Sequence, residues 1–299
     1  MPLAGYLADK KKLIEQYLDG YLPKNQEFPA EIHQAMRYSL FASGKRLRPI
    51  LALAACEAVG GEIKSVLPLA CSLELIHTYS LIHDDLPAMD NDDFRRGQPS
   101  NHKKFGEAIA ILAGDALLTQ AFALLSIPTD LSAALQLQII QEAAAAAGSM
   151  GLIGGQVLDI QTSGNINRVF GQMDAPLLEY IHTHKTGVLF RAAVRIGAIA
   201  GKAAPEQLSA ITGYGDKIGL AFQITDDILD LECTTQELGK PQGSDMAAHK
   251  LTYPAVWGIQ AAREQSQLLL EKACRDLDIF AGKAVVLKDI AGYLLNRRE

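Results

Sequence analysis

The sequence predicts an all-α protein that folds as one large domain. Apolar residues make up 48% of its 299 residues but aromatic residues only 6%, and long stretches are rich in alanine. This composition favours closely packed helices over strands, which are usually rich in β-branched and aromatic residues. No linker rich in proline, glycine or serine divides the chain, so residues 1–299 are expected to form a single domain.

Helical patterns recur along almost the whole chain. The first is an amphipathic segment that begins with Lys10, Lys11 and Lys12, unlike the unbroken apolar core of a signal peptide. Polar or Gly/Pro-marked breaks separate the patterns, and the longest break spans residues 233–251. Further helices are expected at 50–59, 66–83, 108–126, 133–162, 176–200, 205–232, 253–276 and 284–296.

Charge and cysteine usage exclude several classes of protein. The formal net charge is −6 and no dense run of Lys and Arg occurs, which argues against a nucleic-acid partner. The four cysteines lie far apart without CxxC spacing, so we expect core thiols in a reducing compartment rather than disulfides or a zinc site. They are Cys56, Cys71, Cys233 and Cys274.

No segment is expected to span a membrane. The most apolar stretches, 108–118 and 188–200, are interrupted by charged residues and fall short of the run of about 18 apolar residues that a span needs. These charged residues are Asp115, Arg191 and Arg195. We therefore expect a cytoplasmic protein with no membrane partner.

The second of two aspartate-rich motifs has ideal helical spacing. Asp226 and Asp230 are four residues apart, about 400° of helical rotation, so their carboxylates share one face. The flanking residues are apolar, and like charges at the end of a buried helix need a counter-cation. A solvated helix face is the alternative for this motif taken alone.

The first motif places five aspartates in residues 84–93, with Pro87 interrupting the helix. An ideal helix would separate Asp84 and Asp90 by about 120°, so they can share a metal only if the segment 86–89 distorts. Oxygen ligands without His or Cys suit Mg²⁺, which usually binds through a few carboxylates and substrate phosphates. The EF-hand pattern of a calcium loop does not fit.

Basic residues gather at two places beside glycine or proline. Lys45, Arg46 and Arg48 lie in residues 43–49, and Arg95-Arg96 follow the first aspartate motif. Arginine can grip phosphate oxygens bidentately and lysine adds a point charge, although surface solvation or local charge balance would also explain such clusters.

Other candidates are weaker when each is taken alone. His77 lies about two helical turns before Asp84 and so on nearly the same face, although a lone helical histidine is usually structural. Lys185-Thr186-Gly187 interrupts a helix. Lys240 and Lys250 follow the second aspartate motif, where an ordinary exposed loop is the alternative.

Taken together and in order, these motifs resemble the trans-prenyl diphosphate synthases, and the match spans nearly the whole chain. The resemblance implies a bundle of mostly antiparallel helices around a deep central pocket, and a homodimer. The matching motifs are Gly44-Lys45-Arg46-x-Arg48-Pro49, His77, Asp84-Asp85-x4-Asp90, Arg95-Arg96-Gly97, Gly154-Gly155-Gln156-x2-Asp159, Lys185-Thr186-Gly187, Phe222-Gln223-x2-Asp226-Asp227-x2-Asp230 and Gly239-Lys240-x4-Asp245.

The resemblance implies a role for each matching position. Three Mg²⁺ ions would be held by Asp84 and Asp90, with Asp85 nearby, and by Asp226, with Asp230 acting through water. The allylic diphosphate would be bound by Arg95, Lys185 and Lys240. The isopentenyl diphosphate would be bound by Lys45, Arg48, His77 and Arg96. The allylic carbon would be bordered by Thr186 and Gln223, whose oxygens can stabilise developing positive charge.

The implied reaction is ionisation of the allylic C–O bond, attack by the isopentenyl double bond, and loss of a proton to the released diphosphate. Magnesium and the cationic side chains would stabilise the departing diphosphate. Ser43 and Ser100 depart from the family pattern, where glycine and threonine are common, but both leave the charged residues intact.

The resemblance also implies a chain length for the product. The chain resembles bacterial farnesyl diphosphate synthases in a two-residue insertion in the first aspartate motif and in an aromatic residue five positions before it, Tyr79. A bulky ring at the pocket floor would stop growth at C15. Tyr79 as an ordinary core residue is the alternative, since an ideal helix places it about 140° from Asp84. A geranylgeranyl or longer product is the corresponding alternative function.

Two functions from other classes remain open. A class I terpene cyclase also ionises diphosphates with carboxylate-bound magnesium, but it would need only one diphosphate site. A non-catalytic helical scaffold or metal-binding protein would carry the same charges on its surface.

Overall fold

The computed structural model describes residues 2–163, 172–232 and 249–296, and nearly all regular structure within them is helical. The predicted all-α class is therefore confirmed. One short antiparallel hairpin, β1 (Phe94–Arg95) and β2 (Gln98–Pro99), is the exception.

The helices are bounded as follows. The α-helices are α1 (Leu3–Tyr21), α2 (Ala30–Leu40), α3 (Leu47–Val59), α4 (Leu67–Asp84), α5 (Asn101–Phe105), α6 (Glu107–Leu125), α7 (Ala133–Ala147), α8 (Leu152–Thr162), α9 (Ala175–Ile181), α10 (Val188–Ala200), α11 (Pro205–Glu232), α14 (Tyr253–Trp257), α15 (Ile259–Asp276) and α16 (Val285–Asn296). Shorter 3₁₀ segments are η1 (Ile63–Ser65), η2 (Gln172–Asp174) and η4 (Leu277–Ala284), and η3 (His182–Gly187) is a π-helix.

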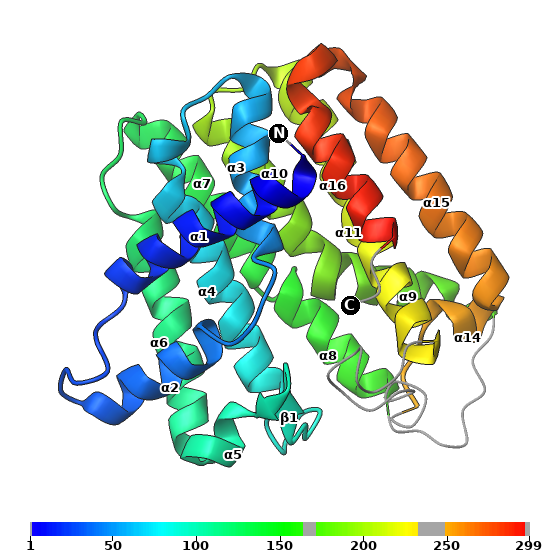
Figure 1. The fold of residues 1–299 in the computed structure, drawn as a ribbon. Coiled ribbons are helices and arrows are strands. Elements are labelled where there is room, and N and C mark those ends of the chain that lie inside the picture. Colours follow the sequence, from blue (N-terminus) through cyan, green and yellow to red (C-terminus); the bar gives the residue numbers. More distant parts are fainter. Residues whose placement is uncertain (1, 164–171, 233–248, 297–299) are drawn as a thin grey trace.

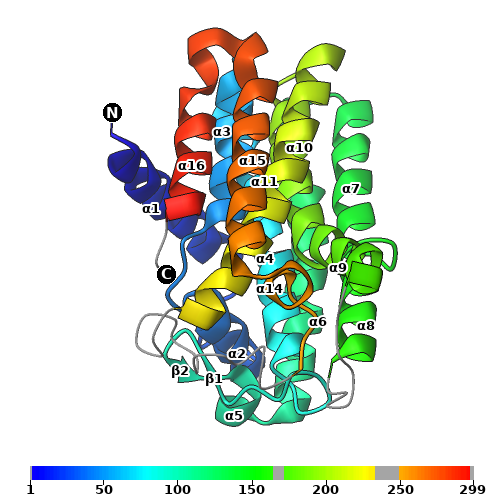
Figure 2. The same ribbon diagram turned by 90° about the vertical axis from the view of Figure 1, so that its right-hand side faces the viewer.

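The long helices run side by side, and α1 crosses the bundle at a steep angle (Figures 1 and 2). Helix α10 packs between α3 and α11, α4 packs against α6 and α3, and α15 covers α11. Helices α3 and α10 are mostly apolar and largely buried, as expected of core helices, and Arg191 marks the exposed side of α10. Their backbones come so close that a Cβ on Gly197 would lie 1.9 Å from the Ala52 carbonyl oxygen.

Two expected helices are each divided in two at glycine. The stretch 133–162 breaks between α7 and α8, where Gly151 has the non-helical angles φ −126° and ψ −126°. The stretch 253–276 breaks at Gly258, whose φ of +80° favours glycine. Helix α2 and the hairpin were not predicted. Helix α2 buries only three residues, so its periodic signal is weak.

Among the residues that the structure describes, two stretches are long and apolar enough, by length and composition alone, to cross a membrane: Glu107–Leu125 and Ala133–Thr162. The first is α6, which packs along α4 in the bundle, and the second is broken between α7 and α8. Cys56 and Cys71 are buried free thiols, Cys274 is a partly buried one, and Cys233 lies outside the described residues.

Candidate active site

The first aspartate motif leaves the helix just before residues 86–89, where a metal shared by Asp84 and Asp90 required a distortion. Helix α4 ends at Asp84, and the chain then folds back so that the backbone N–H of Asp90 donates to the Asp84 carbonyl oxygen at 2.9 Å. The turn is completed by Asn91, which has a φ of +53°. Asp84 and Asp90, which an ideal helix would separate, are thereby brought together.

Cationic side chains surround these carboxylates. Asp84 Oδ2 lies 3.8 Å from Lys185 Nζ, and Asp90 Oδ2 accepts a hydrogen bond from Lys250 Nζ at 2.9 Å. Burial raises the pKa of Asp84 to about 6, with Lys185 opposing and Asp90 adding to the shift. The pKa of Asp90 is lowered, because Lys250 and Lys185 outweigh its burial. The two neighbours therefore differ in proton affinity.

The second aspartate of this motif, Asp85, is paired with arginine. Asp85 is buried and accepts hydrogen bonds from Arg95 Nε, at 2.9 Å, and from Arg95 Nη2. Arg95 also reaches Asp92 at 3.2 Å. The hairpin thus brings Arg95 to the end of α4, beside the acidic motif.

Lys185 is held by a residue to which sequence reasoning gave no role. Its Nζ donates to Asp159 Oδ2 at 2.5 Å, and Asp159 is 6% exposed on α8. Gly155, on the same helix, allows this approach, since a Cβ there would lie 2.2 Å from the Lys185 backbone nitrogen. In the sequence, only the Gly154-Gly155-Gln156-x2-Asp159 motif pointed to Asp159 as a residue of the site.

Thr186 and Gln223, expected to border the reacting carbon, are in direct contact. The π-helix η3, a wide turn of the kind that often marks functional sites, carries Thr186, and its Oγ1 donates to Gln223 Oε1 at 2.7 Å. A cavity of about 80 Å³ is lined by both residues and by Asp159, Lys185 and Lys250.

The second aspartate motif lies within α11, as its spacing predicted. Asp227 and Asp230 are 3% and 2% exposed, whereas Asp226 is half-buried. Asp226 lies near enough to Arg48 to affect its pKa. Among the residues that the structure describes, no group of three or more His, Cys, Asp or Glu side chains is arranged closely enough to hold a metal ion by itself.

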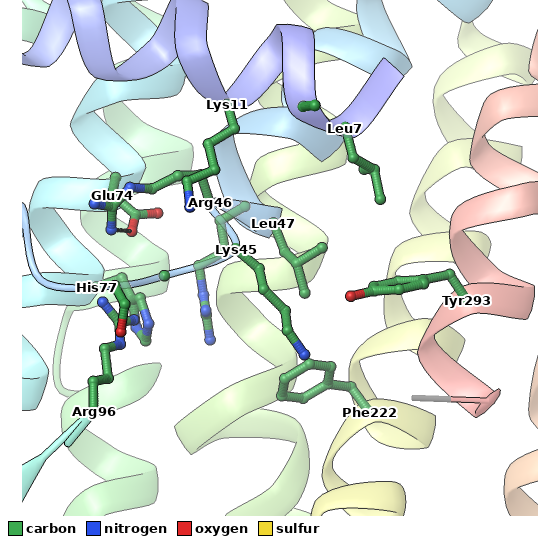
Figure 3. A pocket seen from close by; sticks show the side chains of 14 residues that line it. Leu7, Lys11, Lys45, Arg46, Leu47, Glu74, His77, Arg96, Phe222 and Tyr293 are labelled. Atoms are coloured by element: carbon green, nitrogen blue, oxygen red, sulfur yellow. Dashed lines mark hydrogen bonds and ion pairs between the residues drawn. The ribbon is translucent and has the colours of Figure 1, made fainter. Parts of the chain in front are cut away.

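A second, larger pocket of about 510 Å³ is strongly basic (Figure 3). It is closed by side chains from α1, α4, α11 and α16, among them Leu7, Phe222 and Tyr293. The residues expected to bind isopentenyl diphosphate all line it: Lys45, Arg48, His77 and Arg96. Burial and the neighbouring Arg48, Arg96, Arg95 and Arg46 hold the pKa of His77 well below its ordinary value.

Arg46 also lines this pocket, but its side chain is buried in the pocket wall against Glu74 (Figure 3). Its backbone is left-handed, with φ +52°, and its side chain is fully buried. Its Nη1 donates to Glu74 at 3.0 Å, and its Nε lies 3.3 Å from Glu15. Gly44 permits this arrangement, because a Cβ there would lie 2.8 Å from Arg46 Nη1 and 2.7 Å from Arg96 Nη1.

Tyr79 and Lys240 are the two remaining residues that the sequence predicted for the site. Tyr79 is 5% exposed on α4, its ring lies edge-on to that of His83 with centroids 5.8 Å apart, and its hydroxyl has no hydrogen-bond partner within the described part of the chain. Burial and the nearby Asp84 raise its pKa to about 12. Lys240 lies outside the described residues, so its predicted role is not placed.

Comparison with known proteins adds to this geometry. The chain is 44% identical over 298 residues to a geranylgeranyl diphosphate synthase of Cyanophora paradoxa, covering 99% of this chain and 97% of the relative. It is 45% identical over 274 residues to a farnesyl diphosphate synthase of Geobacillus stearothermophilus, covering 91% and 90%. The crystal structure of an FPP/GFPP synthase from Zymomonas mobilis matches with a TM-score of 0.83 at 35% identity, covering 98% and 97%.

The family model of polyprenyl synthetase matches residues 29–282, which contain both aspartate motifs and the four residues expected to bind isopentenyl diphosphate. The chain therefore belongs to the polyprenyl synthetase family.

Proposed function

We propose that this prenyltransferase joins an allylic diphosphate, dimethylallyl or geranyl, to isopentenyl diphosphate and releases mainly the C15 product, farnesyl diphosphate. The observation that carries the proposal is that two cavities lined by cationic side chains adjoin on α11. Phe222 lines the basic pocket, and the next residue, Gln223, lines the smaller cavity beside the acidic motifs. A condensing enzyme needs two such regions side by side.

The donor set suits magnesium. Asp84 and Asp90 offer only oxygen ligands, and burial and like charge raise the pKa of Asp84, which a bound cation would offset. Asp84, Asp90 and Asp226 would hold the ions, with Asp85 and Asp230 close by. When bound, magnesium neutralises the negative charge that builds up on the departing diphosphate.

The protein's own residues divide the remaining work. Lys185, Arg95 and Lys240 hold the allylic diphosphate, and Asp159 fixes the position of the Lys185 ammonium group. Lys45, Arg48, His77 and Arg96 hold isopentenyl diphosphate. The oxygens of Thr186 and Gln223 stabilise the positive charge on the allylic carbon, and the released diphosphate accepts the proton.

The C15 product rests on Tyr79. Its buried ring on α4 precedes the acidic motif by five residues and would block growth beyond two condensations. The names of several relatives favour a geranylgeranyl product as the alternative. If Tyr79 is the block, Tyr79→Ala will release longer products, and a variant that still releases only C15 would refute that role.

The proposed reaction is tested by supplying both substrates to the purified protein, following diphosphate release with and without Mg²⁺, and sizing the products by chromatography. A scaffold or metal-binding protein would release no diphosphate. A terpene cyclase would consume an allylic diphosphate alone, and Arg48→Ala would leave its activity intact. We expect instead a large increase in the KM for isopentenyl diphosphate. We further propose that the enzyme works as a cytoplasmic homodimer.

A further inference from the structure

Asp227 is the one aspartate of the second motif to which the proposed function gives no task. It is 3% exposed, and its carboxylate is occupied by protein groups. Oδ1 accepts a hydrogen bond from Gln223 Nε2 at 3.0 Å, and Oδ2 accepts one from the backbone N–H of Tyr253 at 2.8 Å. His182 Nε2 lies 3.3 Å from the same Oδ2. Asp227 therefore joins α11, α14 and the π-helix η3.

These contacts fix which group donates and which accepts along the hydrogen bonds that link Asp227, Gln223 and Thr186. Because the Gln223 nitrogen is held by Asp227, its oxygen faces Thr186, whose hydroxyl donates to it at 2.7 Å. A threonine hydroxyl has one proton, so Thr186 then offers only lone pairs to its other neighbours. The cavity of about 80 Å³ is lined by Thr186, Gln223 and Asp227.

We infer that Asp227 is a positioning residue that sets the polarity of the Gln223–Thr186 pair, so that oxygen lone pairs rather than N–H or O–H protons face the allylic carbon. The inference rests on the proposed function, since it requires positive charge to develop at this cavity. A carboxylate suits the task because it can only accept hydrogen bonds, so Gln223 has one favourable orientation. A reversed pair would direct protons at the developing cation.

The substitution Asp227→Asn tests this with little change of shape. The backbone N–H of Tyr253 can only donate, so the new amide keeps its oxygen toward Tyr253 and turns its NH₂ group toward Gln223. Gln223 must then lose its hydrogen bond or flip. We expect kcat to fall about 100-fold, as for a misplaced catalytic group. Both KM values should change little, because the pair acts mainly in the transition state.

A double substitution that exchanges the carboxylate and the amide of Asp227 and Gln223 supplies the decisive comparison. In Asp227→Asn/Gln223→Glu, the asparagine donates to the glutamate, and the glutamate again offers only oxygen to Thr186. We expect kcat at least about tenfold above that of either single variant, because the oxygen-only face is restored. If Asp227 acted as a metal ligand, the double variant would be no better than Asp227→Asn, and the inference would be overturned.

Asp216→Asn on the same helix is the matched control, since Asp216 is exposed, lies 3.9 Å from Arg191 and does not line the cavity. It should leave kcat unchanged. Wild-type kcat in Asp227→Asn would also overturn the inference, whereas an inactive wild-type protein would overturn the proposed function. If Asp227→Asn does not fold, the kcat of the double variant is compared with that of Gln223→Glu alone. A higher kcat in the double variant supports the inference, and an equal or lower one overturns it.

Discussion

At the scale of single residues, we expect His77 to couple the binding of isopentenyl diphosphate to protonation. Burial and four arginines hold its pKa well below the ordinary value of about 6.5, so the free imidazole is neutral at that pH. A bound diphosphate adds negative charge and raises this pKa. The protein should therefore take up protons when isopentenyl diphosphate binds, and binding should tighten as the pH falls through the raised pKa.

Calorimetry of isopentenyl diphosphate binding in buffers of different ionisation enthalpy measures this uptake. The diphosphate also titrates, but its contribution is common to the wild type and to His77→Asn. Equal proton uptake by the two proteins would contradict the prediction.

Glu74 is the buried counter-charge of the basic pocket. It is 2% exposed, bonds Arg46 and lies among Arg48 and Arg96. Glu74→Gln leaves these cations less compensated and should lower the free energy of unfolding by about 3 kcal/mol, as when one partner of a buried pair is removed. Inorganic diphosphate should restore part of that loss, so it should raise the Tm of the variant more than that of the wild type.

Urea unfolding with and without diphosphate checks this prediction. Glu142→Gln is the control, because Glu142 pairs with Arg195 in a partly exposed ion pair and should cost only about 1 kcal/mol, independent of diphosphate. A diphosphate effect of the same size in both variants would argue against the role of Glu74.

The sequence predicted which basic residues line the pocket but not which of them is paired with a buried carboxylate. Lys45, Arg46 and Arg48 all line the basic pocket, but Arg46 has a left-handed backbone and a fully buried side chain that pairs with Glu74. Asp159 was seen as part of a motif without a task, because its partner Lys185 is 26 residues away and meets it only when α8 packs on η3.

At the scale of elements, the contact between α8 and η3 sets the place of Lys185. Gly155→Ala would put a Cβ 2.2 Å from the Lys185 backbone nitrogen, so the two elements must separate. We expect a loss of about 1–3 kcal/mol of stability from overpacking and a higher KM for the allylic substrate. Gly20→Ala in α1 is the control, because a Cβ there meets no atom within 4 Å. This substitution should raise the free energy of unfolding by at most about 1 kcal/mol. An unchanged allylic KM in Gly155→Ala would contradict the prediction.

Helix periodicity predicted where most elements lie, but local backbone geometry decided where they end. Spacing alone predicted Asp226 and Asp230 on one helix, and α11 carries both. The turn that returns Asp90 to Asp84 depends on a hydrogen bond across six residues, which no helical repeat encodes. The breaks at Gly151 and Gly258 were hidden because the apolar pattern continues through them.

At the scale of the whole molecule, the outer face of α6 exposes two large apolar residues beside Asp115. Ile111 and Leu112 are 44% and 54% exposed, and Ala108 and Ala123 on the same helix are also exposed. Apolar residues gathered in this way commonly mark a protein interface. We therefore predict that the homodimer forms through α6.

This face is linked to the acidic motif, so its burial should matter for activity. His83 Nε2 lies 3.0 Å from the Ile111 carbonyl oxygen, and Gly114 allows the ring to pack against α6, since a Cβ there would lie 2.1 Å from that nitrogen. His83 immediately precedes Asp84. A partner that holds α6 in place would therefore also hold the end of α4.

Leu112→Glu tests both statements. Light scattering should give the wild type about twice the chain mass of 32.3 kDa and the variant the mass of one chain, because a charge would be buried unpaired at the interface. The monomer should also show a lower kcat. Ile279→Glu, at a site 57% exposed on η4, should remain dimeric and active. A dimer that survives Leu112→Glu would place the interface elsewhere, and a fully active monomer would show that α4 needs no support from a partner.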